Sequence, residues 1–115
     1  VSLRMPPALY PVARIDEIDD AAIEAQAVVK GDGIKGRVHR VAGPGGEQRI
    51  GRYGWKADIA TLDQMVAEAF ANELGIHSAL SRPKTTIAAP PEDDGALVRA
   101  VTAFVRSLVA PWSPK

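Results

Sequence analysis

The stretch of sequence that decides the fold is Thr61-Leu62-Asp63-Gln64-Met65-Val66-Ala67-Glu68-Ala69-Phe70-Ala71-Asn72-Glu73-Leu74-Gly75. Its larger apolar side chains recur every three or four residues, which is the spacing of one face of an amphipathic helix. Thr61 followed three residues later by Gln64 is a capping-box pattern, typical of a helix N-terminus. The sequence therefore predicts a helix from Leu62 to Leu74, with an apolar stripe made of Leu62, Met65, Val66, Ala69, Phe70 and Leu74.

A second helix is predicted before this stretch. Four acidic residues lie within Asp16–Asp20, an Ala-rich run follows them, and Lys30-Gly31 ends the run. The helix dipole favours acid at the start and base at the end, and glycine is the usual C-terminal cap. We expect this helix over about Asp19–Val29, with an apolar face made of Ile18, Ala22, Ala25 and Val29.

A third helix is predicted after the central one. Glu92-Asp93-Asp94 is a strong helix start, and Pro111 cannot continue a helix. Between them runs an apolar stripe made of Leu97, Val101, Phe104, Val105 and Leu108.

Glycine and proline separate these helices. The proline-rich sequence from Met5 to Pro11 is expected to run extended, because each proline disfavours helix in the residue before it. The region from Gly31 to Gly54 holds eight of the ten glycines. Within it, Arg37–Val41 and Gln48–Tyr53 could pair as a β-hairpin across Gly43-Pro44-Gly45-Gly46.

The expected architecture is one domain or fragment, mainly α, with about three helices joined by long Gly/Pro-rich loops and the option of one short β-hairpin. At 115 residues a second domain is not expected. The predicted segments are an extended arm at 1–14, helices at 15–30, 61–75 and 93–110, a glycine-rich loop at 31–60 and a further loop at 78–92.

Composition excludes several classes of function. Fourteen basic and fourteen acidic residues cancel, so no charge excess favours nucleic acid or an anionic membrane. No apolar run approaches the roughly 20 residues that span a bilayer. The absence of cysteine excludes disulfides, thiolate metal sites and thioether attachment of haem within these residues. The chain starts Val1-Ser2-Leu3, without an initiator Met or a signal peptide, so we expect processing or a shortened chain.

Few residues suggest chemistry. Asp32-Gly33-Ile34-Lys35-Gly36 resembles part of a calcium loop, but no further carboxylates follow at ligand spacing, and a glycine turn with Asp32 bonded to its own backbone is the alternative. His39 and His77 could reach a metal only if the fold brings them together. Met65 and Met5 could ligate a haem iron, although packing explains Met65. No nucleophile, base and orienting group stand out, so a hydrolase has little support.

The run Gly51-Arg52-Tyr53-Gly54-Trp55-Lys56-Ala57 is the most distinctive motif. Its glycines allow close backbone approach, and Arg52, Trp55 and Lys56 supply a cationic and aromatic surface just before the central helix. Two interpretations stay open. This surface meets a ligand or partner, or Trp55 fills the core while the two cations are solvated.

This run, together with Thr61-Leu62 and Ala69–Ile76, resembles the central region of bacterial di-haem proteins related to cytochrome c peroxidase, a family labelled thiol oxidoreductases. Pro6-Pro7-Ala8-Leu9 and Asp32–Arg37 fit the same order, so the resemblance covers most of residues 5 to 76. Tyr53 departs from the commoner Phe of the family, and Lys30-Gly31 makes the Asp32 loop less acidic than the family pattern.

The resemblance implies a segment between two Cys-x-x-Cys-His haem sites, neither of which is in this chain. It implies haem c in the complete protein, a cytochrome c-like partial domain here, and a periplasmic or secreted location. Arg52, Trp55 and Lys56 would then line a haem edge, and Asp32 would be the candidate calcium ligand. The chain alone is not expected to be catalytic, whereas the complete protein would move electrons or reduce a peroxide-like substrate.

The alternative is a haemless scaffold or interaction module that docks a partner through exposed apolar stripes. The reading frame separates the two hypotheses. Cys-x-x-Cys-His motifs on both sides of these residues would favour the first, and stop codons at both ends would favour the second.

Overall fold

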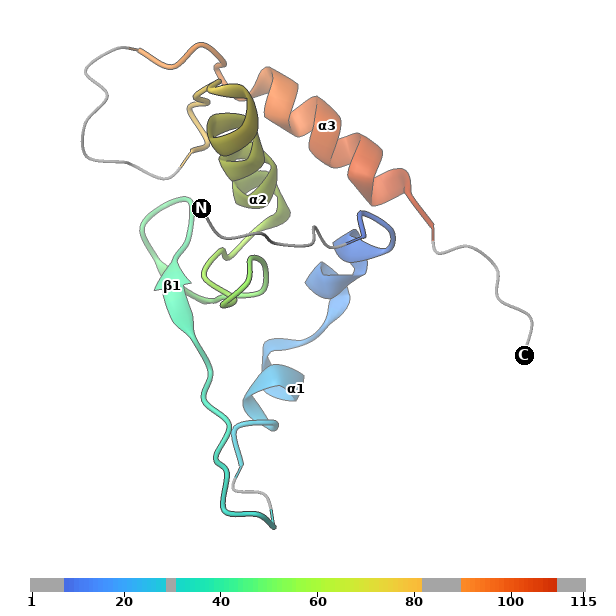
Figure 1. Ribbon diagram of the computed structural model, residues 1–115, viewed down its shortest axis with the longest axis vertical. Helices are drawn as coiled ribbons and strands as arrows, with labels where there is room; N and C mark the ends of the chain where they lie inside the picture. Colours follow the sequence, from blue (N-terminus) through green and yellow to red (C-terminus); the bar gives the residue numbers. More distant parts are fainter. Residues whose placement is uncertain (1–7, 29–30, 82–89, 110–115) are drawn as a thin grey trace.

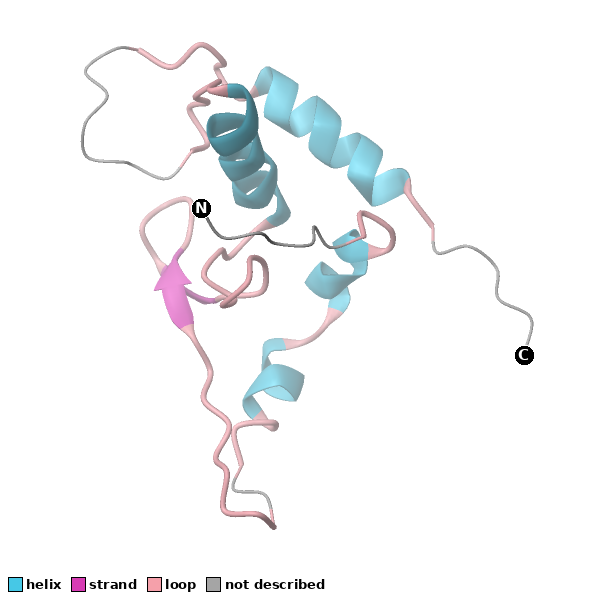
Figure 2. Cartoon of the chain, in the orientation of Figure 1, coloured by secondary structure: helices cyan, strands magenta, loops and turns pink. Residues whose placement is uncertain are grey.

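The computed structural model describes residues 8–28, 31–81 and 90–109 (Figure 1). These residues form four helices and one two-stranded antiparallel hairpin, a mixed small fold rather than a clearly mainly α one. Two of the helices, α2 (Leu62–Ala69) and α3 (Ala96–Ser107), pack against each other at one end of the molecule (Figure 2). None of the described helices is both long enough and apolar enough to cross a bilayer.

The central helix is confirmed. α2 continues into η2 (Phe70–Leu74), a π-type turn that ends at Gly75, whose φ of 70° is left-handed. The Thr61 hydroxyl accepts a hydrogen bond from the Gln64 backbone N–H at 3.2 Å, which caps the helix as the sequence predicts. Of the predicted stripe, Leu62 and Val66 are buried and Met65 and Phe70 are half-buried, whereas Ala69 and Leu74 are exposed.

The predicted helix over Asp19–Val29 is much shorter in the structure. α1 spans only Asp20–Glu24 and buries no residue. The predicted apolar face was wrong, since Ile18, Ala22 and Ala25 are exposed and Val29 lies outside the described residues. A short helix with mostly Ala side chains buries too little surface to offset the entropy of ordering it, so it stops early.

The predicted extended arm at 1–14 is also corrected. Residues 1–7 lie outside the described residues, and Val12–Glu17 form η1, a 3-10 helix. Val12, Ala13 and Ile15 pack from this helix against the buried cluster of Tyr53, Ile59, Leu62 and Val105. Burial of these side chains stabilises a helical turn where proline content alone favoured extended chain.

The predicted hairpin forms, with shorter strands. β1 (Arg40–Ala42) pairs with β2 (Gln48–Ile50) so that Arg40 lies opposite Ile50 and Ala42 opposite Gln48. The Gly43 N–H donates to the Glu47 carbonyl at 2.7 Å and closes the turn. Arg37–His39 and Gly51–Tyr53 lie outside the strands, although Gly51 N–H still bonds His39 carbonyl at 2.9 Å.

The third helix is confirmed, but it begins later and ends earlier than predicted, at Ala96 and Ser107, and it buries a different face. Asp94 and Asp93 accept hydrogen bonds from the backbone N–H groups of Ala96 and Leu97, at 2.9 and 3.0 Å, so the acidic start acts as a cap. A hydrogen bond from the Ser78 hydroxyl lowers the pKa of Asp93. The buried side chains of α3 are Val98, Thr102 and Val105.

The predicted stripe of α3 was therefore wrong for Leu97 and Phe104, and Leu108 lies just beyond the end of the helix. Leu97 is 47% exposed and Phe104 is 60% exposed, whereas Val101 joins both buried clusters. Asp93 and Asp94, which the predicted range 93–110 includes, lie before the helix, because Gly95 is left-handed at φ 99° and the helix begins only at Ala96.

Thr61→Ala should lower the free energy of unfolding by about 1 kcal/mol, because the substitution removes the oxygen that accepts the Gln64 N–H. Urea unfolding followed by far-UV circular dichroism would measure the loss. Thr61→Ser keeps the oxygen and serves as the control. An equal loss in both variants would show that the cap is not the cause.

Candidate functional site

The Gly51–Ala57 motif folds into a tight loop that packs against itself. The loop is closed by an antiparallel bridge between Tyr53 and Ile59, with N–H to carbonyl distances of 3.0 and 3.1 Å. A Cβ on Gly51 would lie 1.7 Å from the Ala57 carbonyl oxygen, so only glycine fits there. The close backbone approach expected of Gly51 therefore serves this loop, and Gly54 adopts the left-handed φ of 83° within it.

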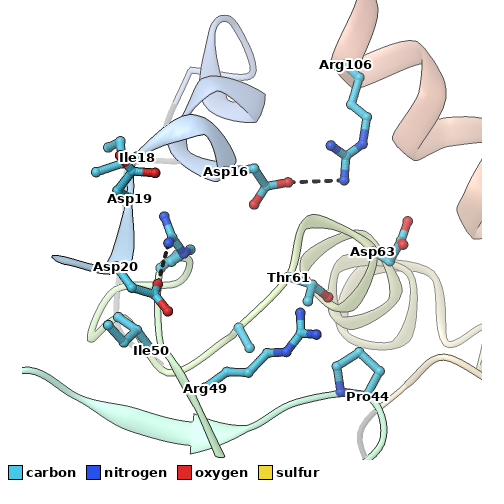
Figure 3. A pocket seen from close by; sticks show the side chains of 12 residues that line it. Asp16, Ile18, Asp19, Asp20, Pro44, Arg49, Ile50, Thr61, Asp63 and Arg106 are labelled. Atoms are coloured by element: carbon cyan, nitrogen blue, oxygen red, sulfur yellow. Dashed lines mark hydrogen bonds and ion pairs between the residues drawn. The ribbon is translucent and has the colours of Figure 1, made fainter. Parts of the chain in front are cut away.

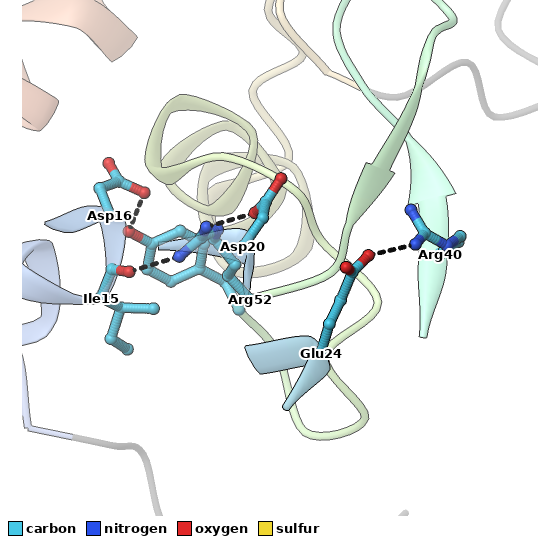
Figure 4. A network of polar contacts seen from close by, with 7 residues as sticks. Ile15, Asp16, Asp20, Glu24, Arg40 and Arg52 are labelled. Atoms are coloured by element: carbon cyan, nitrogen blue, oxygen red, sulfur yellow. Dashed lines mark hydrogen bonds and ion pairs between the residues drawn. The ribbon is translucent and has the colours of Figure 1, made fainter. Parts of the chain in front are cut away.

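Arg52 and Tyr53 tie this loop to the N-terminal segment (Figure 4). The Tyr53 hydroxyl donates to Asp16 at 2.6 Å, and Arg106 of α3 pairs with the other oxygen of Asp16 at 3.1 Å. The Arg52 guanidinium donates to the Ile15 carbonyl at 2.8 Å and to Asp20 at 2.6 Å. These bonds join residues 37 and 32 positions apart, so they fix η1 and α1 against the loop.

Burial and the hydrogen bond to Asp16 raise the pKa of the Tyr53 phenol well above its ordinary value. Tyr53 is only 2% exposed, so a phenolate would be formed next to a carboxylate and away from water. The group is therefore a neutral hydrogen-bond donor at physiological pH.

An apolar cavity of about 470 Å³ opens beside the loop. Its volume falls within the range of small-molecule and side-chain pockets. Trp55 is 66% exposed, so the interpretation that it fills the core is wrong. The lining consists of Val12, Ile15, Arg52, Tyr53, Gly54, Trp55 and Met65.

A second apolar hollow of about 370 Å³ adjoins the first, because Val12 and Ile15 line both. Tyr10 and Ile18, which are 50% and 45% exposed, stand on its other side. The surface of η1 and the tip of the loop thus form one continuous apolar area. We call it the η1–Trp55 surface, and it consists of Tyr10, Val12, Ile15, Ile18, Trp55 and Met65.

A third cavity, of about 820 Å³, is polar, and Arg52 lines it as well as the apolar cavity (Figure 3). Asp16, Asp19, Asp20 and Asp63 line it with three arginines. Each arginine already has a carboxylate partner, since Arg49 pairs with Glu47, Arg52 with Asp20 and Arg106 with Asp16. Four carboxylates and three guanidinium groups line the cavity, so their charges nearly cancel and leave an excess of one negative charge.

The residues considered as metal ligands remain apart from one another. Asp32 is exposed and accepts a hydrogen bond from the Ile34 N–H at 3.0 Å, which is the turn that the sequence offers as the alternative to calcium. His39 Nδ1 donates to the Lys56 carbonyl at 2.9 Å. Within residues 8–28, 31–81 and 90–109 no three His, Asp or Glu side chains gather as a metal site. Calcium at Asp32 stays a prediction.

The predicted site residues therefore separate into two roles. The side chain of Arg52 is 12% exposed and has a structural role. Its hydrogen bonds to the Ile15 carbonyl and to Asp20 stabilise the wall of the apolar cavity. Trp55 and Lys56 are exposed at the tip of the loop. Met65 lies in the cavity wall, whereas Met5 is outside the described residues.

Sequence reasoning missed Asp16 as the partner of Tyr53. The acidic run was predicted to start a helix, but Asp16 belongs to η1 and accepts a hydrogen bond from the hydroxyl of Tyr53, 37 positions away. No local pattern marks such a pair. An acid next to apolar residues was the only available signal.

Comparisons of this chain with family models, with curated proteins and with solved structures find no match.

Gly51→Ala should destabilise the protein by roughly 2 kcal/mol or more, because the added methyl cannot avoid the Ala57 carbonyl without moving the loop. Thermal and urea unfolding would measure this change. Gly31→Ala is the matched control, since nothing lies within 4 Å of a Cβ at that position. Equal stabilities of the two variants would contradict the tight-loop interpretation.

Tyr53→Phe should lower the free energy of unfolding by about 1 to 2 kcal/mol near neutral pH, because Asp16 loses a donor. The folded pKa of Tyr53 lies above the ordinary value of 10.0, so the folded state holds this proton more tightly than the unfolded chain does. The stabilisation by the Tyr53–Asp16 hydrogen bond is complete below pH 10.0 and declines as the pH rises from there through the folded pKa. Urea unfolding at several pH values should thus show the gap between wild type and Tyr53→Phe narrowing above pH 10.0.

Tyr10→Phe is the control for this pH series, because Tyr10 is 50% exposed. It should match the wild type at every pH. A Tyr53→Phe difference that stays constant through the alkaline range would contradict the assignment.

Proposed function

We propose that this chain is the segment between the two haem-attachment sites of a di-haem c-type redox protein, where it supplies packing surface and no catalytic group. The observation that carries the proposal is the exposed Trp55 at the wall of the 470 Å³ apolar cavity. An indole two-thirds exposed beside apolar side chains is typical of a surface that another body covers.

The energetics favour a covered η1–Trp55 surface. A buried Trp removes about 150 to 250 Å² from water, so covering the exposed part of Trp55 contributes on the order of 3 kcal/mol at about 25 cal/mol/Å². Val12, Ile15 and Met65 add to this area. Two bonds from Arg52 hold the wall in place, so docking orders few further side chains.

The residues fit contact with a haem held elsewhere and do not fit a haem attached here. The sequence has no cysteine to form thioether bonds, and the described histidines do not gather with other ligands. When bound in the complete protein, haem c would supply electron transfer. Trp55 and Met65 would exclude water from an apolar edge, and Lys56 is an exposed cation next to Trp55 in the sequence.

The same resemblance supports a cytochrome c-like partial domain and a periplasmic or secreted location as parts of this proposal. The resembled family is labelled thiol oxidoreductase, but the label alone identifies no thiol substrate. The reaction proposed for the complete protein is therefore electron transfer or reduction of a peroxide-like substrate.

The second candidate function is a haemless interaction module. The observation that favours it is the continuity of the two apolar hollows through Val12 and Ile15, which makes a surface wide enough for an apolar side-chain cluster of a partner. In this case the η1–Trp55 surface binds a partner protein that carries no haem.

Expression of the complete reading frame in a host with c-type haem maturation tests the first function. We expect covalently bound haem, detected by its reduced absorption spectrum after denaturation, and a shifted visible circular dichroism spectrum in the Trp55→Ala variant. Ile34→Ala is the matched control, because Ile34 is equally exposed at 66% and does not line the cavity.

Two results would overturn the proposal. One is a complete protein without covalent haem, which would leave the interaction module. The other is a haem spectrum that responds equally to Trp55→Ala and Ile34→Ala, which would separate Trp55 from any haem.

A further inference from the structure

Two peptide bonds in this chain join an aspartate to a glycine, Asp32–Gly33 and Asp94–Gly95. In each pair the carboxylate accepts a hydrogen bond from the backbone N–H two positions further on, at 3.0 Å from Ile34 and at 2.9 Å from Ala96. Both glycines are left-handed, with φ of 81° and 99°. The two pairs therefore share their local geometry, and a difference in their chemistry must come from what surrounds them.

This local geometry favours a reaction between the carboxyl group and the chain itself. The hydrogen bond turns the carboxyl back toward the peptide that follows it, where the glycine nitrogen is the nearest nucleophile. Glycine has no Cβ to shield this nitrogen, and its backbone rotates more freely than that of other residues. The nitrogen attacks the side-chain carbonyl carbon, and the hydroxyl of the protonated carboxyl leaves with the amide proton as water. The product is a succinimide ring.

Hydrolysis of the ring completes the reaction. Opening at the side-chain carbonyl restores aspartate, whereas opening at the main-chain carbonyl leaves the chain connected through the side chain, as isoaspartate. One water leaves and one returns, so the reaction needs no oxidant, reductant or further reactant, and the mass of the chain is unchanged. The main chain gains a methylene group, and the former main-chain carbonyl becomes a free carboxylate.

The surroundings of Asp32 allow this ring to form. All residues from Gly31 to Lys35 are exposed, and the segment lies at the lower tip of the molecule, away from α2 and α3 (Figure 1). No atom of the described residues lies within 4 Å of a Cβ at Gly31 or at Gly33. The Asp32–Gly33 peptide can therefore rotate until its nitrogen reaches the carboxyl carbon, at a small cost in local contacts.

The surroundings of Asp94 oppose the same ring. On one side, Asp93 bonds segment 77–79 through both its backbone N–H and its carbonyl, at 3.1 and 2.8 Å. On the other side, the buried Gly95 accepts the Arg99 N–H at 3.0 Å through its carbonyl. Rotation of the Asp94–Gly95 peptide would break these bonds, so ring closure there requires the start of α3 to unfold locally.

We propose that Asp32 is a site of isoaspartate formation in the folded protein and that Asp94 is protected from it. The new carboxylate would be exposed in the loop between α1 and β1, as an acceptor for a carboxyl methyltransferase of the isoaspartate-repair class, which uses S-adenosylmethionine. The inference is independent of the proposed haem contact, because residues 31–35 line neither of the two apolar hollows.

Ageing of the purified 115-residue chain for several weeks at mildly acidic pH tests the proposal. Since the mass is unchanged, electron-transfer fragmentation of proteolytic peptides locates the isoaspartate. We expect it at Asp32, and at least about tenfold less at Asp94, because opening the start of α3 adds to the barrier there. Transfer of a labelled methyl group from S-adenosylmethionine by an isoaspartate methyltransferase gives a second readout, and Asp32→Ala should remove most of the label.

Two controls separate the fold from the local sequence. In concentrated urea both pairs lose their surroundings, so isoaspartate should form at the two positions at similar rates. In the folded chain, Gly33→Ala should slow the reaction at Asp32, because the methyl group shields the nitrogen, whereas Gly31→Ala should not. Equal rates at the two positions of the folded chain would overturn the proposal. So would a folded chain without isoaspartate at Asp32, or a difference between the two positions that persists in urea.

Discussion

The hydrogen bond from the buried Tyr53 hydroxyl to Asp16 is the interaction on which the other contacts depend. It joins the 3-10 helix η1 to the loop before α2, and Arg106 brings α3 to the same carboxylate. Three parts of the chain, far apart in sequence, therefore meet at one side chain. Since Tyr53 also belongs to the main buried cluster, the polar link and the apolar core hold the same segments together.

The core around this link is small, and this explains why so much apolar surface stays outside. Two buried clusters, joined through Val101, contain few large side chains, and Leu62 and Val98 are the largest that are fully buried among the described residues. Aromatic residues make up only 5% of the chain, so few large side chains are available to fill the core. Trp55 and Phe104 consequently stay 66% and 60% exposed.

The Gly51–Ala57 motif contains both residues that stabilise the loop and residues that are exposed on it. Gly51, Gly54 and Tyr53 make the loop possible, and Arg52 fixes it to η1 and α1. Trp55 and Lys56 are the residues that this framework presents outward. The framework accounts for most of the motif without a ligand, so the proposed contact with a haem-bearing body concerns only the tip.

The amino-acid sequence by itself determined the central helix with its Thr61 cap and Gly75 end, the acidic cap of α3, the hairpin turn and the Asp32 turn, because each depends on neighbours within a few positions. Only the tertiary structure decided that Val12–Glu17 is helical, that α1 is short, and that Val98 rather than Leu97 faces inward. It also decided that Arg52 turns toward Ile15 and Asp20 while Trp55 turns outward. These outcomes depend on which distant segments bury a given side chain, and that information is spread over the whole chain and absent from any local pattern.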